Sequence, residues 1–385
     1  MKHSIIAATV VAASLALGTA AQAELTVGFV TSQSGPGSSI GVLYDRGIKA
    51  AAEYASAVGA EKIKLIQLDD GSDPSAATRN ARKLVEENKV DLLIGTATAP
   101  SSIAMVAVAN ELKVPMISIS PITVPATDSG DRWAIAMPQP PSLMVKVAVD
   151  RMKRNGIKNF AYIGFSDAWG DLVYNGAQKP AQADGMKILT NERYARTDTS
   201  VTGQVLKILA TKPDAVLLGG SATQGALPPL ALAERGYKGP LYGTPSLLNA
   251  DFIRVGGKAV EGVQVSAGPV IVAEQLPDDH FSKKISLAFR EAYQKANGMP
   301  TTDGFSAYSF DAWLVFLDAA KRAMATGAKP GTPEFRTALK NAIFTTKDLA
   351  GTHAIYNFKP GDSYGVDDRA LVMVRLVNGQ WKYEP

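Results

Sequence analysis

The feature that most constrains the fold is an alternation of short apolar runs with helical patterns, which begins near residue 25. The first series contains the apolar runs LTVGFV, KIKLIQLDD, VDLLIG and VPMISIS, with helical patterns near 42–58, 75–88 and 101–112. Asp73 and Pro74 are typical of the start of the second of these helices. Strands that alternate with helices in this way predict a parallel sheet covered on both faces.

The alternation starts again after residue 138. It contains the runs FAYIGFS, KILTNERY, AVLLGG and PLYGT, with helical patterns near 142–155, 170–184, 201–211 and 224–236. Because 385 residues exceed one ordinary hydrophobic core, the sequence predicts two successive α/β lobes. Three further helices are expected near 280–297, 304–326 and 333–342, followed by a strand-rich tail with a hairpin turn at Asn378-Gly379. We expect this tail to pair with or cover one of the lobes.

Residues 1–23 have the pattern of a secretory signal peptide. Lys2 and His3 precede the apolar run SIIAATVVAASLALGTA, and Ala21-Gln22-Ala23 matches a cleavage site before Glu24. The alternative is a membrane anchor, but the run is short, rich in alanine and ends in the cleavage site. The mature chain is therefore predicted to be exported, with cleavage near Ala23, and free of the membrane.

Composition and motifs give no support for catalysis, metal binding or nucleic-acid binding. The chain has no cysteine, and its formal net charge of +4 is too small to indicate a nucleic-acid partner. The two histidines beyond residue 23, His280 and His353, are far apart and lack metal-ligand spacing. GSATQG and VGGKAVEG have the wrong spacing for a nucleophile elbow and a Walker loop. We predict no cofactor, no metal and no catalytic residue.

The loop SQSGPGSSIG, residues 32–41, comes close to the glycine fingerprint of a dinucleotide site. Asp69 and Asp70 end the second strand, where such a site places its ribose-binding acid. However, the third glycine, Gly41, comes one residue late. A dehydrogenase or a hydrolase on an α/β scaffold therefore stays a remote alternative. The favoured hypothesis is that this loop forms one wall of a cleft, with Ser34 to Ile40 near a ligand.

Loops rich in glycine and hydroxyl groups follow several of the predicted strands. They are TSQSGPGSS, GTATAPSS, SISPIT, GFSDAWG, GGSAT and YGTPS. Backbone N–H groups, hydroxyls and helix N-termini bind small anionic groups such as carboxylates. Phe165 and Trp169 add apolar surface beside these loops. A cleft between two such lobes is expected to bind a small molecule by lobe closure.

Over most of its length the chain resembles the periplasmic solute-binding proteins of ABC importers, in the branch of the leucine/isoleucine/valine-binding proteins. The resemblance rests on the order and spacing of SGPGSSIG, LDDGSDPSAATRNARKLVEENKVDLLIG, VPMISIS, AYIGFSDAWG and FDAWLVFLDAAKRA. It implies an α/β type I binding-protein fold, with two Rossmann-like lobes, parallel sheets, three hinge crossings and a ligand cleft between the lobes. The implied lobes are 24–138 plus 271–347 and 139–270 plus 348–385.

The resemblance also implies positions for ligand contacts. In the family, the loops after DLLIG and VPMIS hold the ligand carboxylate, and these are Thr98 to Ser102 and Ser118 to Thr123 here. Ala99 stands where the family has its central carboxylate-binding serine, and Trp169 stands at the usual aromatic position of the second lobe. The candidate ligand-binding residues are Ser34, Ile40, Thr98, Ala99, Ser101, Ser118, Ser120, Phe165, Trp169, Ser221, Ala222, Thr244 and Pro245.

One departure from the family pattern bears on the ligand. Amino-acid binders place an acid in the stretch YGTPSLLN to pair the ligand ammonium, and Pro245 stands there. Burial of an ammonium without a carboxylate partner is costly. Asp167 could substitute, so an amino acid stays an alternative. We favour an aromatic or other non-amino organic acid, because GGKAVEGVQVSAGPVIVAEQLPDD also resembles members that take up aromatic acids.

The implied function is that of a receptor that captures a small carboxylate by lobe closure. It would deliver this ligand to the permease subunits of an ABC importer in the membrane. The expected location is the periplasm, and the expected state is a monomer. A sensor module with the same fold, coupled to a receptor instead of a permease, is the remaining alternative.

Overall fold

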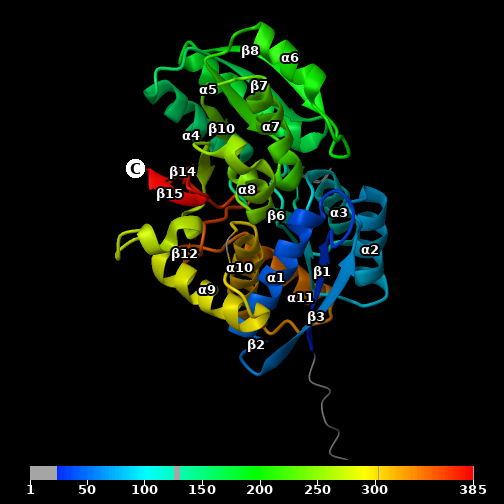
Figure 1. Cartoon of the computed structure of the whole chain (residues 1–385). Helices are drawn as coiled ribbons and strands as arrows, with labels where there is room; N and C mark the ends of the chain where they lie inside the picture. The colour runs from blue at the N-terminus through cyan, green and yellow to red at the C-terminus, as the bar shows by residue number, and fades with distance from the viewer. Residues whose placement is uncertain (1–23, 125–130, 302, 385) are drawn as a thin grey trace, which may run out of the picture.

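The computed structural model describes residues 24–124, 131–301 and 303–384, so the predicted signal peptide at 1–23 lies outside the described residues. Two α/β lobes lie one on top of the other (Figure 1). The first lobe contains the blue N-terminal part together with the yellow and orange helices, and the second contains the green part and the red C-terminal strands. None of the described helices has the length and apolar character needed to cross a membrane.

The first sheet has six strands in the order β2-β3-β1-β4-β5-β6, and all neighbours except β2 and β3 are parallel. Strands β4 and β5 are buried along their whole length, as expected for parallel strands covered on both faces. In sheet order, the strands are β2 (Ala57–Val58), β3 (Glu61–Asp69), β1 (Leu25–Thr31), β4 (Leu92–Gly95), β5 (Met116–Ser118) and β6 (Ala134–Ala136).

Among the described residues, six helices belong to the first lobe, and the positions predicted for them are confirmed with small shifts. They are α1 (Ser38–Tyr54), α2 (Pro74–Glu86), α3 (Ala99–Leu112), α9 (Lys283–Asn297), α10 (Ser306–Met324) and α11 (Pro333–Ile343). Asp73 caps α2 as predicted, because its carboxylate accepts a 2.7 Å hydrogen bond from the backbone N–H of Ala76. The range predicted for α1, 42–58, was too late, because this helix begins inside the glycine loop and ends before the short β2–β3 hairpin.

The second sheet is mixed, with the order β15-β14-β11-β10-β9-β7-β8. Its strands are β8 (Lys187–Tyr194), β7 (Asn159–Phe165), β9 (Ala215–Gly219), β10 (Leu241–Gly243), β11 (Gln264–Ala267), β14 (Val372–Val377) and β15 (Gln380–Glu384). The C-terminal tail pairs antiparallel with β11, so the prediction that it joins one of the lobes is confirmed. Asn378 and Gly379 both have positive φ angles, as the predicted hairpin turn requires.

Four helices of the second lobe, α4 to α7, follow the order predicted from the sequence, and α8 was not predicted. The helices are α4 (Pro141–Arg154), α5 (Ala168–Ala183), α6 (Thr202–Ala210), α7 (Leu227–Glu234) and α8 (Ala250–Gly256), and short 3-10 turns η1 (Ala222–Ala226), η2 (Pro245–Leu247) and η3 (Gly257–Val260) lie between strands and helices. The expected α/β class, with two sheets of mostly parallel strands, is confirmed.

The chain passes between the two sheets three times. It leaves the first sheet after β6, returns after β11 through η4 (Pro269–Gln275), and leaves again after β13 through η5 (Asp368–Ala370) to reach β14. The β12–β13 hairpin (Leu349–Ala350 and Ile355–Tyr356) is bound to α10 of the first lobe, since the Asp311 carboxylate accepts hydrogen bonds from the backbone of Thr352 and His353. The lobe boundaries predicted from the sequence stay a prediction.

Asp311 is fully buried under this hairpin, and burial raises its pKa to about 6. Three hydrogen bonds to its carboxylate favour the charged form, but their effect is smaller than that of burial. Because an unfolded aspartate has a pKa of about 3.9, the folded protein binds this proton more tightly, and stability from this group rises as pH falls from about 6 toward 4. From pH 7 to pH 5, we expect the wild type to gain about 1.4 kcal/mol of unfolding free energy relative to Asp311→Asn. Urea unfolding of both proteins at the two pH values measures the difference.

The Asp311→Asn variant serves as its own control, because it keeps every other titratable group of the chain. Subtracting its unfolding free energy from that of the wild type removes the acid destabilisation caused by paired carboxylates elsewhere. A difference that stays constant or shrinks on acidification would contradict a raised pKa at Asp311.

Candidate functional site

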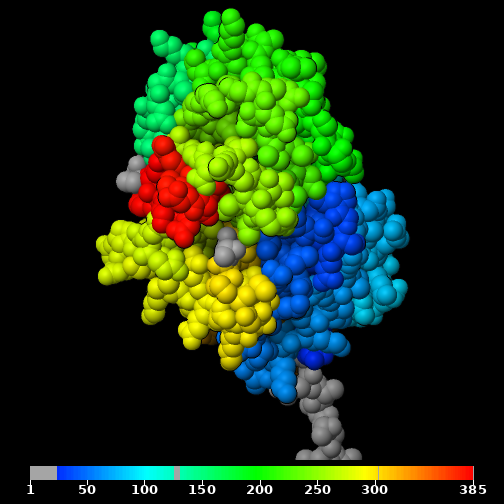
Figure 2. Space-filling model, in the orientation of Figure 1, coloured from blue at the N-terminus to red at the C-terminus, as the bar shows by residue number. Residues whose placement is uncertain are grey.

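The loops that follow the parallel strands of both lobes meet at the junction between the lobes. Figure 2 shows the green second lobe in direct contact with the blue and yellow parts of the first lobe. A cavity lies at this junction, and its lining comes from loops after β4, β5, β9 and β10 and from helices of both lobes. Parallel sheets bind ligands at the carboxyl ends of their strands, so this position agrees with the fold.

The N-terminus of α3 forms one part of the cavity. Thr98 caps this helix, since its hydroxyl accepts a 3.4 Å hydrogen bond from the backbone N–H of Ser101, and Ala97 and Ala99 line the cavity. The Ser101 hydroxyl is fully buried and has no hydrogen-bond partner among the described residues. Unsatisfied N–H groups and a partial positive charge at a helix N-terminus favour an anion nearby.

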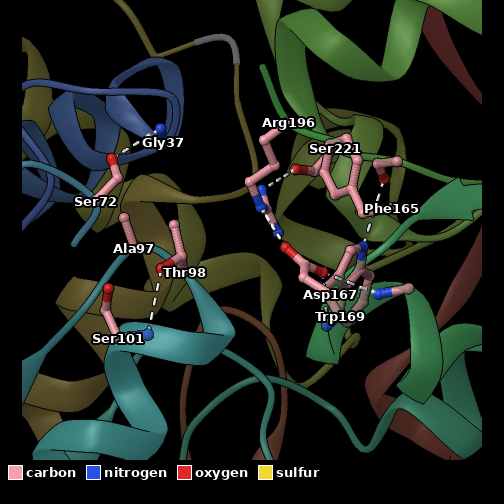
Figure 3. A network of polar contacts seen from close by, with 12 residues as sticks. Gly37, Ser72, Ala97, Thr98, Ser101, Phe165, Asp167, Trp169, Arg196 and Ser221 are labelled. Atoms are coloured by element: carbon pink, nitrogen blue, oxygen red, sulfur yellow. Dashed lines mark hydrogen bonds and ion pairs between the residues drawn. The ribbon is translucent and has the colours of Figure 1, made fainter. Parts of the chain in front are cut away.

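Three polar groups of the glycine loop after β1 form hydrogen bonds within the protein. The backbone N–H of Gln33 and the hydroxyl of Ser34 donate to the Asp69 carboxylate at 2.8 and 2.6 Å, and the N–H of Gly37 donates to the Ser72 hydroxyl at 2.8 Å (Figure 3). A nucleotide phosphate would need these same N–H groups. The loop therefore does not offer the phosphate cradle that the dehydrogenase alternative requires.

Arg196 is the main charged group of the cavity. Its Nε donates to the Asp167 carboxylate at 2.6 Å, its Nη1 donates to the Ser221 hydroxyl at 3.2 Å, and its guanidinium lies 4.1 Å from the centroid of the Phe165 ring. These contacts use only part of the N–H donors of a guanidinium. Figure 3 shows Arg196 on the side of this group that faces Ala97 and Thr98 of the first lobe.

Asp167 is fully engaged by its own lobe. It caps α5, accepting from the backbone N–H groups of Trp169 and Gly170 at 3.0 and 3.3 Å, while its other oxygen pairs with Arg196. The sequence left open that Asp167 binds a ligand ammonium. In the structure its charge is already compensated by Arg196 and by the helix N-terminus, so it holds the arginine in position instead.

Aromatic and apolar side chains form most of the remaining wall. Tyr44, Phe305 and Tyr308 come from the first lobe, and Trp169 comes from the second. The space between the lining atoms is about 460 Å³ when the solvent at the mouth of the cavity is included. The described lining residues are Ile40, Tyr44, Ala97, Ala99, Ser120, Pro121, Pro138, Met144, Trp169, Arg196, Ser221, Pro245, Ser246, Phe305 and Tyr308.

The charge of this lining is one-sided. Arg196 is its one cation, and no aspartate or glutamate is among the described residues that line the cavity. The described residues also contain no group of acids and histidines able to hold a metal ion.

A family model for periplasmic binding proteins matches residues 24–375. This chain belongs to the periplasmic binding protein family. Its predicted family and two-lobed fold class are therefore confirmed, and so is its expected non-enzymatic class, since the family consists of solute-binding receptors.

Individual relatives agree with the family model. An extracellular ligand-binding receptor from Rhodopseudomonas palustris HaA2 is 43% identical, with a TM-score of 0.89, and the match covers 94% of this chain and all of that one. An amino acid binding protein of Pseudomonas aeruginosa is 27% identical over 56% of this chain and 59% of its own length. An ABC transporter solute-binding protein of R. palustris in complex with benzoate shares the fold at 21% identity, with a TM-score of 0.75, over 94% of this chain and 95% of its own.

In this periplasmic binding protein, the cavity brings together six of the candidate residues. These are Ile40, Ala99, Ser120, Trp169, Ser221 and Pro245. Their role in ligand binding stays a prediction.

The other seven candidates lie outside the described lining. Ser34 is bound to Asp69 at the surface, and the Phe165 ring packs against the guanidinium of Arg196. The remaining five candidates are buried in the protein outside the lining: Thr98, Ser101, Ser118, Ala222 and Thr244.

Several lining residues of this binding protein were not found from the sequence. Arg196 follows the strand KILTNERY, so the same rule that selected the other loops after strands would have selected it. Tyr44, Met144, Phe305 and Tyr308 lie within helices or at a helix start, where the sequence offers no signal that separates them from core residues.

Proposed function

We propose that this protein is exported with a signal peptide cleaved near Ala23, captures a small carboxylate between its lobes, and delivers it to the permease subunits of an ABC importer. The observation that carries the proposal is Arg196, which is held by Asp167, Ser221 and Phe165 at a cavity with no acid in its described lining. A preorganised guanidinium is the side chain best suited to bind a carboxylate. The N-terminus of α3, where Ala97 and Ala99 line the cavity, lies across the junction and would support the same group.

The ligand that fits this lining best is an aromatic or other apolar organic acid. Four aromatic side chains and the apolar residues Ile40, Met144 and Pro138 line the cavity. Rings that pack against one another gain both buried apolar area and favourable edge or offset contacts.

An amino acid is the second candidate, and the name of the P. aeruginosa relative favours it. A buried ligand ammonium would need a carboxylate partner. The described lining offers none, and Asp167 is committed to Arg196. The aromatic faces of Tyr44, Phe305 and Tyr308 could stabilise a cation in part, so the two candidates must be separated by experiment.

Matched ligand pairs separate the two candidates. We expect 3-phenylpropanoate and 4-methylpentanoate to raise the melting temperature of the purified mature protein, and phenylalanine and leucine, which add only an ammonium, to bind at least about a hundredfold more weakly. A ligand present at 100 times its dissociation constant adds about 2.7 kcal/mol of stability. Thermal unfolding with each ligand, followed by calorimetric titration of those that bind, gives the comparison.

A neutral amide, 3-phenylpropanamide, controls for apolar burial without a charge and should not bind. Binding of the amino acid of either pair without its deaminated partner would reverse the ligand assignment. The failure of every carboxylate in the set to bind would contradict the proposed function. Uptake of a labelled ligand in cells with and without the gene decides whether the receptor serves a permease or a sensor. Light scattering of the purified protein tests the expected monomer.

A further inference from the structure

Three hydroxyl-bearing side chains of the first lobe line the cavity, and the direction of their hydrogen bonds is fixed. Tyr44 donates to the backbone carbonyl of Ile119 at 2.6 Å, and Ser120 donates to the carbonyl of Ala97 at 3.1 Å. A carbonyl oxygen can only accept, so these two bonds consume the protons of both hydroxyls.

The third hydroxyl belongs to Tyr308 and is oriented through a relay. It donates to Oε1 of Gln139 at 2.7 Å, while Nε2 of the same amide donates to the backbone carbonyl of Ala370 at 2.8 Å. Because the Ala370 carbonyl requires a donor, the amide cannot turn over, and its oxygen must face Tyr308. The Tyr308 ring is stacked on His353, with centroids 3.9 Å apart and an angle of 11° between the planes, and this contact helps to hold the ring in place.

A hydroxyl group has a single proton, and in these three residues it is already donated to the protein. Any hydrogen bond between Tyr44, Ser120 or Tyr308 and a ligand must therefore be donated by the ligand. Burial raises the pKa of Tyr44 and of Tyr308, so both phenols keep their protons. The Ser246 hydroxyl of the second lobe also donates its proton, to the backbone carbonyl of Gly220 at 2.8 Å.

The opposite holds at Arg196. Its guanidinium can only donate, and the Ser221 hydroxyl, which accepts from it, still has its own proton to donate. The cavity thus has a donor end, where a carboxylate would bind, and a hydroxyl wall of Tyr44, Ser120 and Tyr308 that can only accept.

We propose that the hydroxyl wall selects ligands that carry a neutral hydrogen-bond donor, a hydroxyl group, in addition to their carboxylate. We assign Gln139 as the positioning residue that keeps Tyr308 in its accepting state. This inference rests on the proposed function and makes it more specific. A methoxy group or a second carboxylate has no proton to donate, and each would place lone pairs against lone pairs at this wall.

The first experiment compares ligands that differ in one group. Benzoate and 3-phenylpropanoate are tested by calorimetric titration as their hydroxy, methoxy and carboxy derivatives, at each ring position, against the mature protein. For the hydroxy acid that binds most tightly, we expect about tenfold weaker binding of the methoxy derivative at the same position, and no measurable binding of the carboxy derivative.

The second experiment changes Gln139 or Tyr308 and measures the effect on the selectivity for hydroxy acids. In Gln139→Leu the Tyr308 proton is released, so this hydroxyl can donate, and the hydroxy-to-methoxy affinity ratio should fall to about one or below. Tyr308→Phe removes the hydroxyl without touching Gln139 and should also bring the ratio close to one. This second variant keeps the test valid if Gln139→Leu fails to fold. A variant that acts only on stability would lower the affinities for the hydroxy and the methoxy acid alike and leave their ratio unchanged.

The outcomes are distinguishable from those that test the proposed function. If the unsubstituted or methoxy acids bind as tightly as every hydroxy acid, the selection is wrong while carboxylate binding stands. If both variants keep the wild-type ratio, the roles assigned to Tyr308 and Gln139 are wrong. If no carboxylate of either ligand set binds, the inference and the proposed function both fall.

Discussion

Replacement of Arg196 by methionine should weaken binding of the best carboxylate ligand on the order of a hundredfold, about 3 kcal/mol. The loss exceeds that of one ordinary hydrogen bond for two reasons. The ligand loses its only cationic partner in the described lining, and Asp167 keeps its negative charge beside the site without the arginine that compensates it. Calorimetric titration of wild type and variant measures the change.

Two further variants show whether the effect belongs to the ligand. Arg193→Met removes a comparable arginine that pairs with Asp171 at 3.0 Å and lies over Tyr162, but this residue is outside the cavity lining, so binding should be unchanged. Adding Asp167→Asn to Arg196→Met removes the uncompensated charge and should recover part of the lost affinity, since asparagine can still cap α5. Unchanged affinity in Arg196→Met would remove this arginine from the site.

Replacement of Gly41 by alanine should lower the unfolding free energy by about 3 kcal/mol. A Cβ at this position would stand 1.9 Å from the backbone carbonyl oxygen of Ser32, which cannot rotate away. Helix α1 would have to shift away from β1, and Ile40 and Tyr44 of the cavity lining would shift with it. Urea unfolding measures the stability, and titration of the same variant should show weaker ligand binding.

Gly203→Ala is the matched control, because this helical glycine has open space where its Cβ would stand. Alanine there should be neutral or should stabilise the protein by about 0.5–1 kcal/mol. Equal stability of Gly41→Ala and wild type would mean that α1 adapts without cost, and the close approach would then not explain this glycine.

The fold could be predicted to the level of its elements because their signals are local. Apolar strands followed by capped helices, such as the Asp73-Pro74 start of α2, locate each element within a few residues. The Asn378-Gly379 turn likewise predicted β14 and β15. The partner of this hairpin could not be predicted, because its pairing with β11 joins strands more than a hundred residues apart in the chain.

The candidate site was predicted in outline and incompletely in its chemistry. Loops after strands carry a composition signal, which found Ser120, Trp169 and Ser221. The composition of the glycine loop placed Ser34 among the candidates, but its hydroxyl binds Asp69 and it does not line the cavity. Tyr44 and Tyr308 have the helical spacing of core residues, and only the three-dimensional packing of α1 and α10 brings them to the cavity. Hydrogen-bond direction, on which the proposed ligand selection rests, has no trace in the sequence.

The three passages between the sheets have a consequence for how the chain folds as it is made. A polypeptide appears at a ribosome or a membrane pore with its N-terminus first, and domains commonly fold in that order. Here the first lobe needs α9, α10 and α11, and the second sheet needs β14. Neither lobe can complete its core until nearly the whole chain has appeared. We therefore expect the chain to reach its final packing only late in its synthesis.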